Sequence, residues 1–258
     1  MGVIYADNAA TTRLSDAAFE AMKPYMLNEY GNASTLYKLG RNAHKAVENA
    51  RGVFAKGINA YPAEIYFTSG GTESDNWAIK GTAHRLAGSG KKHIVTDNIE
   101  HHAVLNSAKA LEREGFEVTC VSSDKNGLVR AEDVAAAIRP DTALVSVMFA
   151  NNELGTIQPV EEIGSICRSE GVLFHCDAVQ AAGILPIDVK QMNIDLLSMS
   201  AHKFHGPKGV GIMYARRGCV PETYIDGGEQ ERGHRAGTEN VAGIVGAAAA
   251  FAEAISER

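Results

Sequence analysis

The sequence has little cysteine, no excess of basic charge and no long apolar run. Its four cysteines, Cys120, Cys167, Cys176 and Cys219, lack the Cys-x-x-Cys spacing, which argues against a disulfide framework and against a zinc site. The net charge of -6 argues against a nucleic-acid partner, because such partners usually need a clustered basic face. No stretch reaches the roughly 18 uncharged apolar residues of a membrane helix, and no signal-type segment opens the chain. We therefore expect a cytoplasmic protein with free thiols and without a membrane partner.

Short apolar runs and helical patterns alternate along most of the 258 residues. Runs rich in β-branched and aromatic residues predict strands at 64–68, 93–96, 116–121, 143–149, 172–176, 195–199 and 210–214. Such short runs are also compatible with buried helix segments, but their length and residue types favour strands. Helical patterns are found at 15–27, 36–55, 73–86, 103–114, 131–138, 160–169 and 239–256. This order predicts an α/β fold with a mainly parallel seven-stranded sheet and helices on both faces, whose last two strands are antiparallel because their connection is short.

Polar residues follow five of the predicted strands, at the point where each strand ends. They are found in Ser69–Ser74, Glu100–His102, Asn151–Glu153, Asp177–Gln180 and Ser200–Lys203. Each of these segments taken alone is compatible with a turn or a helix cap. Because the carboxyl ends of parallel strands meet at one edge of a sheet, the five together predict a ligand site there.

The residue types at these strand ends fit a pyridoxal 5'-phosphate enzyme. Such a site needs an amine for a Schiff base, a carboxylate beside the pyridine nitrogen and donors for the phosphate. Lys203, Asp177 and the glycine-rich turn at Gly71 and Thr72 supply these three groups. The imidazole of His101 could stack on the ring and transfer protons near neutral pH.

Eight motifs together resemble the cysteine desulfurases of the NifS/IscS kind. The motifs are Tyr5–Thr12, Tyr30–Ser34, Phe67–Ser74, Glu100–Val104, Asn151–Gly155, Asp177–Gln180, Ser200–Lys203 and Glu231–Thr238. They occur in the family's order and cover the chain nearly end to end. The resemblance implies the large domain of a pyridoxal phosphate-dependent transferase, of the aspartate aminotransferase-like fold. It also implies removal of sulfur from L-cysteine to give L-alanine and an enzyme persulfide, for iron–sulfur cluster assembly or other sulfur-transfer pathways.

The resemblance also implies a role for each matching residue. Lys203 would form the Schiff base, Asp177 would pair with the pyridine nitrogen, and His101 would stack on the ring and take part in proton transfer. The remaining cofactor contacts would be Asn152 and Gln180 at the ring hydroxyl side, with Asn152 also near the substrate carboxylate, and Thr72, Ser200, His202 and the backbone N–H of Gly71 at the phosphate. Thr238 would complete the phosphate site of a second subunit in a homodimer. No residue is expected to bind a metal.

The sequence departs from the family pattern at its C-terminal end. In the family, the sulfur-accepting cysteine and an arginine that grips the substrate carboxylate lie beyond the helix at 239–256, and none of the four cysteines matches that place. We expect an N-terminal active-site segment at 1–14, a cofactor-binding large domain at 15–258 and no C-terminal small domain. We accordingly expect no sustained turnover from this chain alone, and the four cysteines are expected to be small buried or edge residues.

Two other functions fit the same residues. One is a different lysine-dependent pyridoxal phosphate enzyme, such as a selenocysteine lyase or an aminotransferase, because one fold hosts many chemistries. The other is a non-catalytic, truncated cofactor-binding homologue that keeps the dimer and a docking surface for an iron–sulfur scaffold or sulfur-acceptor protein.

Overall fold

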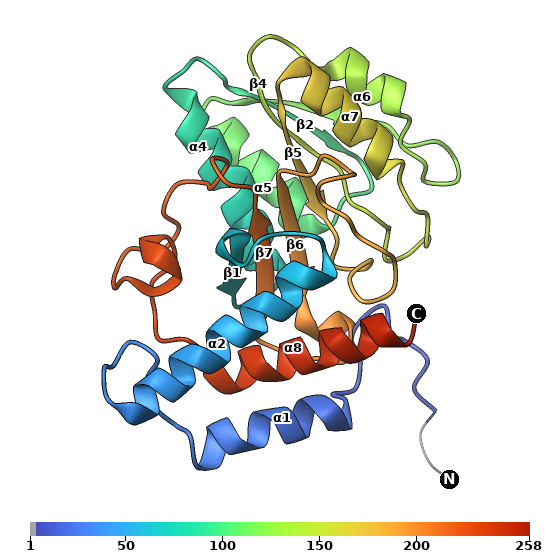
Figure 1. Cartoon of the computed structure of the whole chain (residues 1–258). Helices are drawn as coiled ribbons and strands as arrows, with labels where there is room; N and C mark the ends of the chain where they lie inside the picture. The colour runs from blue at the N-terminus through green and yellow to red at the C-terminus, as the bar shows by residue number, and fades with distance from the viewer. Residues whose placement is uncertain (1–3) are drawn as a thin grey trace.

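A seven-stranded sheet runs through the centre of the molecule in the computed structural model, which describes residues 4–258 (Figure 1). Its strands are β1 (Ile65–Thr68), β2 (His93–Asp97), β3 (Glu117–Val121), β4 (Thr142–Ser146), β5 (Leu173–Asp177), β6 (Leu196–Ser200) and β7 (Gly211–Ala215). The strand order is β1-β7-β6-β5-β4-β2-β3, and only β7 runs antiparallel to its neighbours. The predicted mainly parallel sheet and the antiparallel last pair are confirmed.

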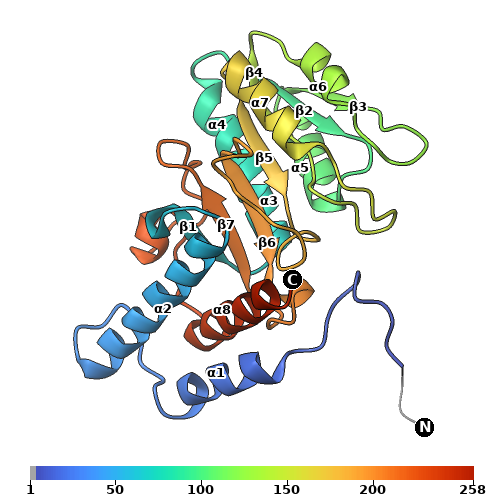
Figure 2. The ribbon, with the colours of Figure 1, turned by 45° about the vertical axis from the view of Figure 1, so that its right-hand side comes forward.

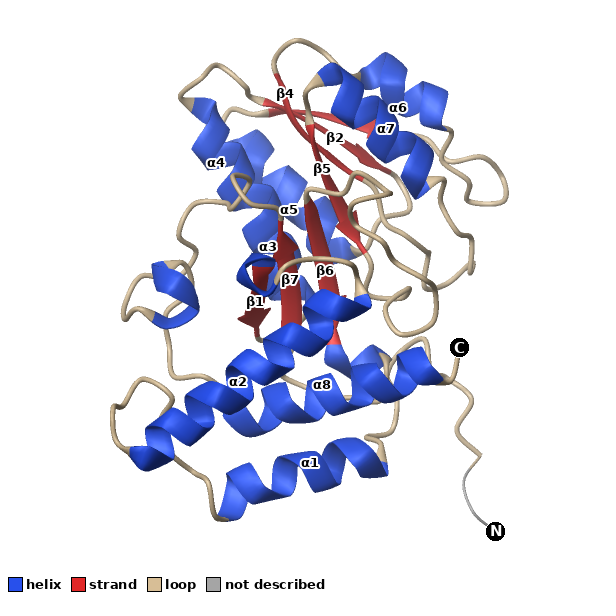
Figure 3. Ribbon diagram, in the orientation of Figure 1, coloured by secondary structure: helices blue, strands red, loops and turns tan. Residues whose placement is uncertain are grey.

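Helices cover both faces of this sheet (Figures 2 and 3). They are α1 (Asp16–Leu27), α2 (Lys38–Gly57), α3 (Gly71–Asn76), α4 (Thr82–Ala87), α5 (His102–Arg113), α6 (Ala131–Ala137), α7 (Val160–Glu170) and α8 (Val241–Ser256). A π-helical segment, Trp77–Gly81, joins α3 to α4, so that residues 71–87 form one continuous helix. The predicted helices are confirmed, with ends that differ by a few residues.

Neighbouring residues along the strands enter two different cores, because successive side chains point to opposite faces of a sheet. Leu144 belongs to the cluster that contains Trp77, on the side of α3 to α5. Val145 belongs to the cluster that contains Phe54, on the side of α2, α6, α7 and α8. Because β4 is buried along its whole length, its sequence is a continuous apolar run rather than an alternating one.

Three helices from the two ends of the chain lie side by side below the sheet (Figure 1). α8 packs between α1 and α2, and the rings of Phe54 and Phe251 stack with centroids 4.9 Å apart. Gly246 permits the close approach of α1, since a Cβ atom there would lie 2.4 Å from Cγ of Met22. No helix in residues 4–258 is both long and apolar enough to cross a membrane.

The segment before α1 crosses the edge of the sheet at which β5 and β6 end. The backbone N–H of Thr12 donates to the carbonyl of His202 across 2.9 Å, and the N–H of Ser15 donates to the carbonyl of His205 across 2.9 Å. Of the predicted N-terminal active-site segment, residues 1–3 lie outside the described residues. The described part of this segment lies beside the turn that carries Lys203, although the two are far apart in the sequence.

Candidate active site

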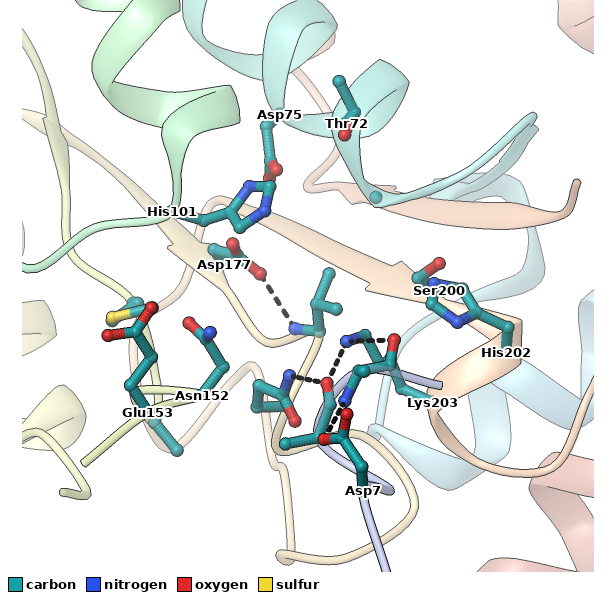
Figure 4. A pocket seen from close by; sticks show the side chains of 17 residues that line it. Asp7, Thr72, Asp75, His101, Asn152, Glu153, Asp177, Ser200, His202 and Lys203 are labelled. Carbon is teal, nitrogen blue, oxygen red and sulfur yellow. Dashed lines mark hydrogen bonds between the residues drawn. The ribbon is translucent and has the colours of Figure 1, made fainter. Parts of the chain in front are cut away.

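A cavity of about 440 Å³ opens at the carboxyl ends of β5 and β6 (Figure 4). Among the predicted site residues it is lined by Gly71, Thr72, His101, Asn152, Asp177, Gln180, Ser200, His202 and Lys203. Thr238 is not among its lining residues and borders a separate cavity of about 150 Å³. The structure therefore brings residues from all five predicted strand ends together in one cavity.

Lys203 lies in a single 3-10 turn, Ala201–Lys203, directly after β6. Its Nζ donates to the backbone carbonyl of Ala10 across 3.0 Å and also to that of Ala9. Burial lowers the pKa of the Lys203 amine, while the carboxylates of Asp177 and Asp7 act in the opposite direction. A lowered pKa increases the neutral, nucleophilic fraction of this amine.

Asp177 is the last residue of β5 and is almost completely buried. Its Oδ1 accepts the N–H of Val179 across 2.9 Å, which fixes the orientation of the carboxyl group. Burial raises the pKa of Asp177, and the Val179 N–H, His101 and Lys203 oppose this rise. A buried carboxylate in this position is suited to a cationic partner in the cavity.

His101 immediately precedes α5 and caps that helix. Its Nδ1 accepts the N–H of Ala103 across 3.1 Å, so in the neutral ring the proton is on Nε2. Figure 4 shows the ring between Asp75 and Asp177, at the edge of the cavity. The capping role and the place at the cavity are therefore combined in one residue.

The start of the helix at Gly71 forms a cradle of hydrogen-bond donors. Thr72, Ser200, His202 and Lys208 line a cavity of about 470 Å³ together with Gly71. A Cβ atom on Gly71 would lie 2.7 Å from Cγ2 of Val179, so a larger residue would close the cradle. The first N–H groups of a helix, two hydroxyls and two basic side chains are a suitable donor set for a phosphate group.

Asn151 and Asn152 have different environments although they are adjacent. Oδ1 of Asn151 accepts the N–H groups of Glu153 and Leu154 across 2.9 and 2.8 Å, which makes Asn151 part of the turn. Asn152 instead lines the cavity, as does Gln180, whose Nε2 donates to the carbonyl of Ala9 across 3.0 Å. The turn interpretation is thus correct for Asn151, while Asn152 is available to a ligand.

Sequence reasoning missed a buried acidic group behind the cavity. Asp75 lines the cavity beside His101 (Figure 4). The side chains of Asp97 and Glu100 are buried as well. Burial raises the pKa of Asp75 and Glu100, and it raises that of Asp97 to about 7. The spacing of Thr72 and Asp75, three residues apart on one helix, is the signal that could have placed Asp75 on the cavity side.

None of the four cysteines lines this cavity. Cys167, Cys176 and Cys219 are buried, and Cys120 is exposed on the edge strand β3. Burial raises the pKa of Cys167 to about 12 and that of Cys176 well above its usual value. Within residues 4–258, no group of three or more His, Cys, Asp and Glu side chains is arranged to hold a metal ion.

A lysine, a buried carboxylate and an anion cradle at one edge of an α/β sheet define the class of pyridoxal phosphate-dependent transferases. The model of the aminotransferase class-V family matches residues 4–256, and the chain belongs to this family.

Proteins named as cysteine desulfurases are among the relatives that resemble the chain. The chain is 54% identical to "Cysteine desulfurase IscS" of Methanosarcina thermophila over 94% of its own length. Its fold is similar to a solved "NifS-like protein" with a TM-score of 0.96 and 46% identity, covering 98% of this chain and 70% of that one. It is also similar to the structure "SspA in complex with cysteine", with a TM-score of 0.94 and 42% identity, covering 96% of this chain and 72% of that one. The chain spans 60% of the length of the Methanosarcina protein.

Proposed function

We propose that this chain contributes the cofactor-binding domain of a pyridoxal phosphate-dependent cysteine desulfurase, which removes sulfur from L-cysteine and leaves L-alanine. The observation that carries this proposal is the meeting of Lys203, Asp177 and the Gly71–Thr72 cradle in one cavity. The 54% identity to a cysteine desulfurase supports the choice of substrate within the family.

The residues of the cavity fit pyridoxal phosphate. Lys203 would hold its aldehyde carbon, Asp177 its ring nitrogen, and the Gly71–Thr72 turn its phosphate, while further contacts would come from Asn152, Gln180, Ser200 and His202. When bound, the cofactor supplies an electron sink that stabilises negative charge on the substrate carbon.

The protein side chains control protons around this group. Burial increases the neutral fraction of the Lys203 amine, as nucleophilic attack requires. His101 carries its ring proton on Nε2, because its Nδ1 accepts the Ala103 N–H, and this Nε2–H is the group that can donate to a ligand. Asp177 would pair its carboxylate with the ring nitrogen, and its burial would strengthen that interaction by excluding water.

The proposal includes a homodimer and the division into an N-terminal segment at 1–14 and a large domain at 15–258. Large apolar side chains between α1 and α2 are exposed, and among them Tyr30 is 72% and Leu36 is 89% exposed. Exposed apolar side chains of this kind support the proposal that a second subunit covers them. Thr238 lies outside its own subunit's cavity, which is consistent with a contact to a second subunit. Sedimentation equilibrium of the cofactor-loaded chain tests the dimer.

Borohydride reduction of the cofactor-loaded chain tests the site. Reduction should fix the pyridoxyl group on Lys203, and Lys203→Ala should abolish the label. Lys190→Ala is the matched control, because Lys190 is an exposed lysine whose Nζ lies over the ring of Tyr61, away from the cavity. Labelling of another lysine in the parent chain would show the site assignment to be wrong. Transamination in place of alanine and sulfide release would favour an aminotransferase.

A further inference from the structure

Glu73 places a carboxylate at the rim of the anion cradle. It lies in the first turn of the continuous helix 71–87, directly after Thr72, and it lines the cavity of about 470 Å³ that contains the cradle. Its Oε2 accepts the N–H of Ser69 across 2.9 Å and also the hydroxyl of Ser69. The carboxylate therefore shapes the turn at 69–72 that precedes the helix.

A free carboxylate at this place would oppose the binding of a phosphate dianion, because like charges repel strongly where solvent is excluded. The Glu73 side chain is only 12% exposed, so water screens its charge poorly. Its pKa is nevertheless lowered, because the hydrogen bonds from Arg235 and Ser69 outweigh the effect of burial. Glu73 thus keeps its charge at neutral pH.

Arg235 compensates this charge through two hydrogen bonds. Nε of Arg235 donates to Oε1 of Glu73 across 2.7 Å, and Nη2 donates to Oε2 across 3.2 Å. This fork geometry fixes the orientation of both groups, and lysine cannot reproduce it. The two residues are 162 positions apart in the sequence.

The loop that carries Arg235 is held firmly against the edge of the sheet. Glu231 in this loop accepts two hydrogen bonds from Arg51, across 2.9 and 3.0 Å, and a third from the N–H of Phe67 across 3.0 Å. Arg232 donates to the carbonyl of Ile65 across 2.9 Å. The guanidinium of Arg235 is thus delivered to Glu73 by an anchored segment rather than by a free surface side chain.

We propose that Arg235 is a positioning residue of the phosphate site: by neutralising Glu73 it allows the helix start at Gly71 to bind a phosphate group, although it does not itself line the cradle. This role deepens the proposed function, since the phosphate would be that of the cofactor. It predicts that loss of Arg235 weakens the binding of phosphate-bearing ligands selectively. Removal of the Glu73 charge should then restore their binding.

The test compares ligands with and without phosphate on four proteins: the parent chain, Arg235→Gln, Glu73→Gln and the double variant. Pyridoxamine 5'-phosphate and pyridoxamine are titrated by fluorescence, because neither can attach to Lys203. Inorganic phosphate is titrated by ³¹P NMR. Glutamine at position 73 keeps an oxygen that can accept the Ser69 N–H, so the turn is preserved.

We expect Arg235→Gln to weaken the binding of pyridoxamine phosphate and of inorganic phosphate about tenfold, equivalent to ~1.4 kcal/mol. The affinity for pyridoxamine should stay nearly unchanged. The double variant should return to the parent affinity for phosphate, and Glu73→Gln alone should bind phosphate at least as tightly as the parent. Arg235→Lys, which keeps the charge without the fork, should recover only part of the loss. Arg139→Gln is the control, because Arg139 pairs with Asp141 and Glu117 on the surface away from the cavity.

The inference would be overturned if Arg235→Gln lost as much affinity for pyridoxamine as for pyridoxamine phosphate. It would also be overturned if the double variant bound phosphate no more tightly than Arg235→Gln. In that case Arg235 would only support the loop. The proposed function is tested separately by labelling of Lys203. Phosphate binding that depends on Arg235 in a chain that does not label at Lys203 would uphold the inference and contradict the proposed function.

Discussion

Asp177 ends β5 and Lys203 follows the neighbouring strand β6, and both residues line the same cavity (Figure 4). Burial lowers the pKa of Lys203 and raises that of Asp177, and the attraction between the two groups opposes both shifts. The carboxylate thus keeps the amine more protonated than burial alone would.

Asp177→Asn should therefore lower the pKa of Lys203 further. Because the neutral amine attacks the cofactor aldehyde, the rate of cofactor attachment should reach half its maximum at a lower pH than in the parent. Stopped-flow absorbance over pH 6 to 10 measures this, with Asp188→Asn, a half-buried carboxylate that does not line the cavity, as control. A midpoint that stays in place or moves upward would contradict the coupling.

The same variant should bind the cofactor yet fail to exchange the substrate α-proton, since the ring nitrogen would lose its anionic partner. A hydrogen bond to a charged group is worth roughly 1.5–3 kcal/mol, so exchange should fall at least about tenfold. Proton exchange in D₂O, followed by NMR, measures it. Exchange at the parent rate would remove Asp177 from the proposed site.

The strands and the edge that carries the site could be predicted from the sequence, because β1, β2, β4, β5, β6 and β7 are buried along nearly their whole length. The order of the strands in the sheet could not be predicted, because the pairing of β1 with β7 joins residues about 150 positions apart and leaves no local signal in the sequence. Lys203 and Asp177 follow strand ends and were predictable. Asp75 was missed because its place on the cavity side depends on a helix face and on the packing of α3 beneath β6.

The acidic group behind the cavity should make stability depend on pH. The pKa of Asp97 is raised to about 7 from a usual value near 4, so its stabilising contribution is complete below about pH 4 and is lost as pH rises through 7. Asp97→Asn should therefore gain stability relative to the parent between pH 5 and 8, by roughly 2–4 kcal/mol. Urea unfolding at the two pH values measures this difference. A relative stability that is constant with pH would contradict the raised pKa of Asp97.

The pair between Arg51 and Glu231 should be a main support of the loop at 229–238. Both side chains are about 5% exposed, and Glu231 adopts a left-handed backbone with φ of 46° that the surrounding contacts must maintain. Arg51→Met keeps the volume but leaves a buried, unpaired carboxylate, which should lower the free energy of unfolding by about 3–5 kcal/mol.

Urea unfolding checks this expectation, with Arg139→Met as the control at an exposed pair, where little change is expected. Combining Arg51→Met with Glu231→Gln should recover a large part of the loss, because glutamine can still accept the Phe67 N–H. A double variant as unstable as Arg51→Met would show that the loss comes from packing rather than from the unpaired charge.

The polypeptide of residues 1–258, tested alone, should bind pyridoxal phosphate without sustaining desulfuration of L-cysteine. Sulfur transfer needs a thiolate held in line with the reacting sulfur, and positioned groups contribute several kcal/mol to such steps, up to about 7–11. No cysteine lines the cavity, and burial raises the pKa of Cys219 as well as that of the more deeply buried thiols.

Alanine and sulfide release should therefore stay near background unless an external thiol is added. Replacing Cys120 and Cys219 by serine, and the deeply buried Cys167 and Cys176 by alanine, should not change the rate with added thiol, provided that cofactor binding and the unfolding transition are preserved. Activity without added thiol that disappears only in Cys219→Ser would identify Cys219 as a sulfur acceptor. That result would contradict the assignment of all four cysteines as structural.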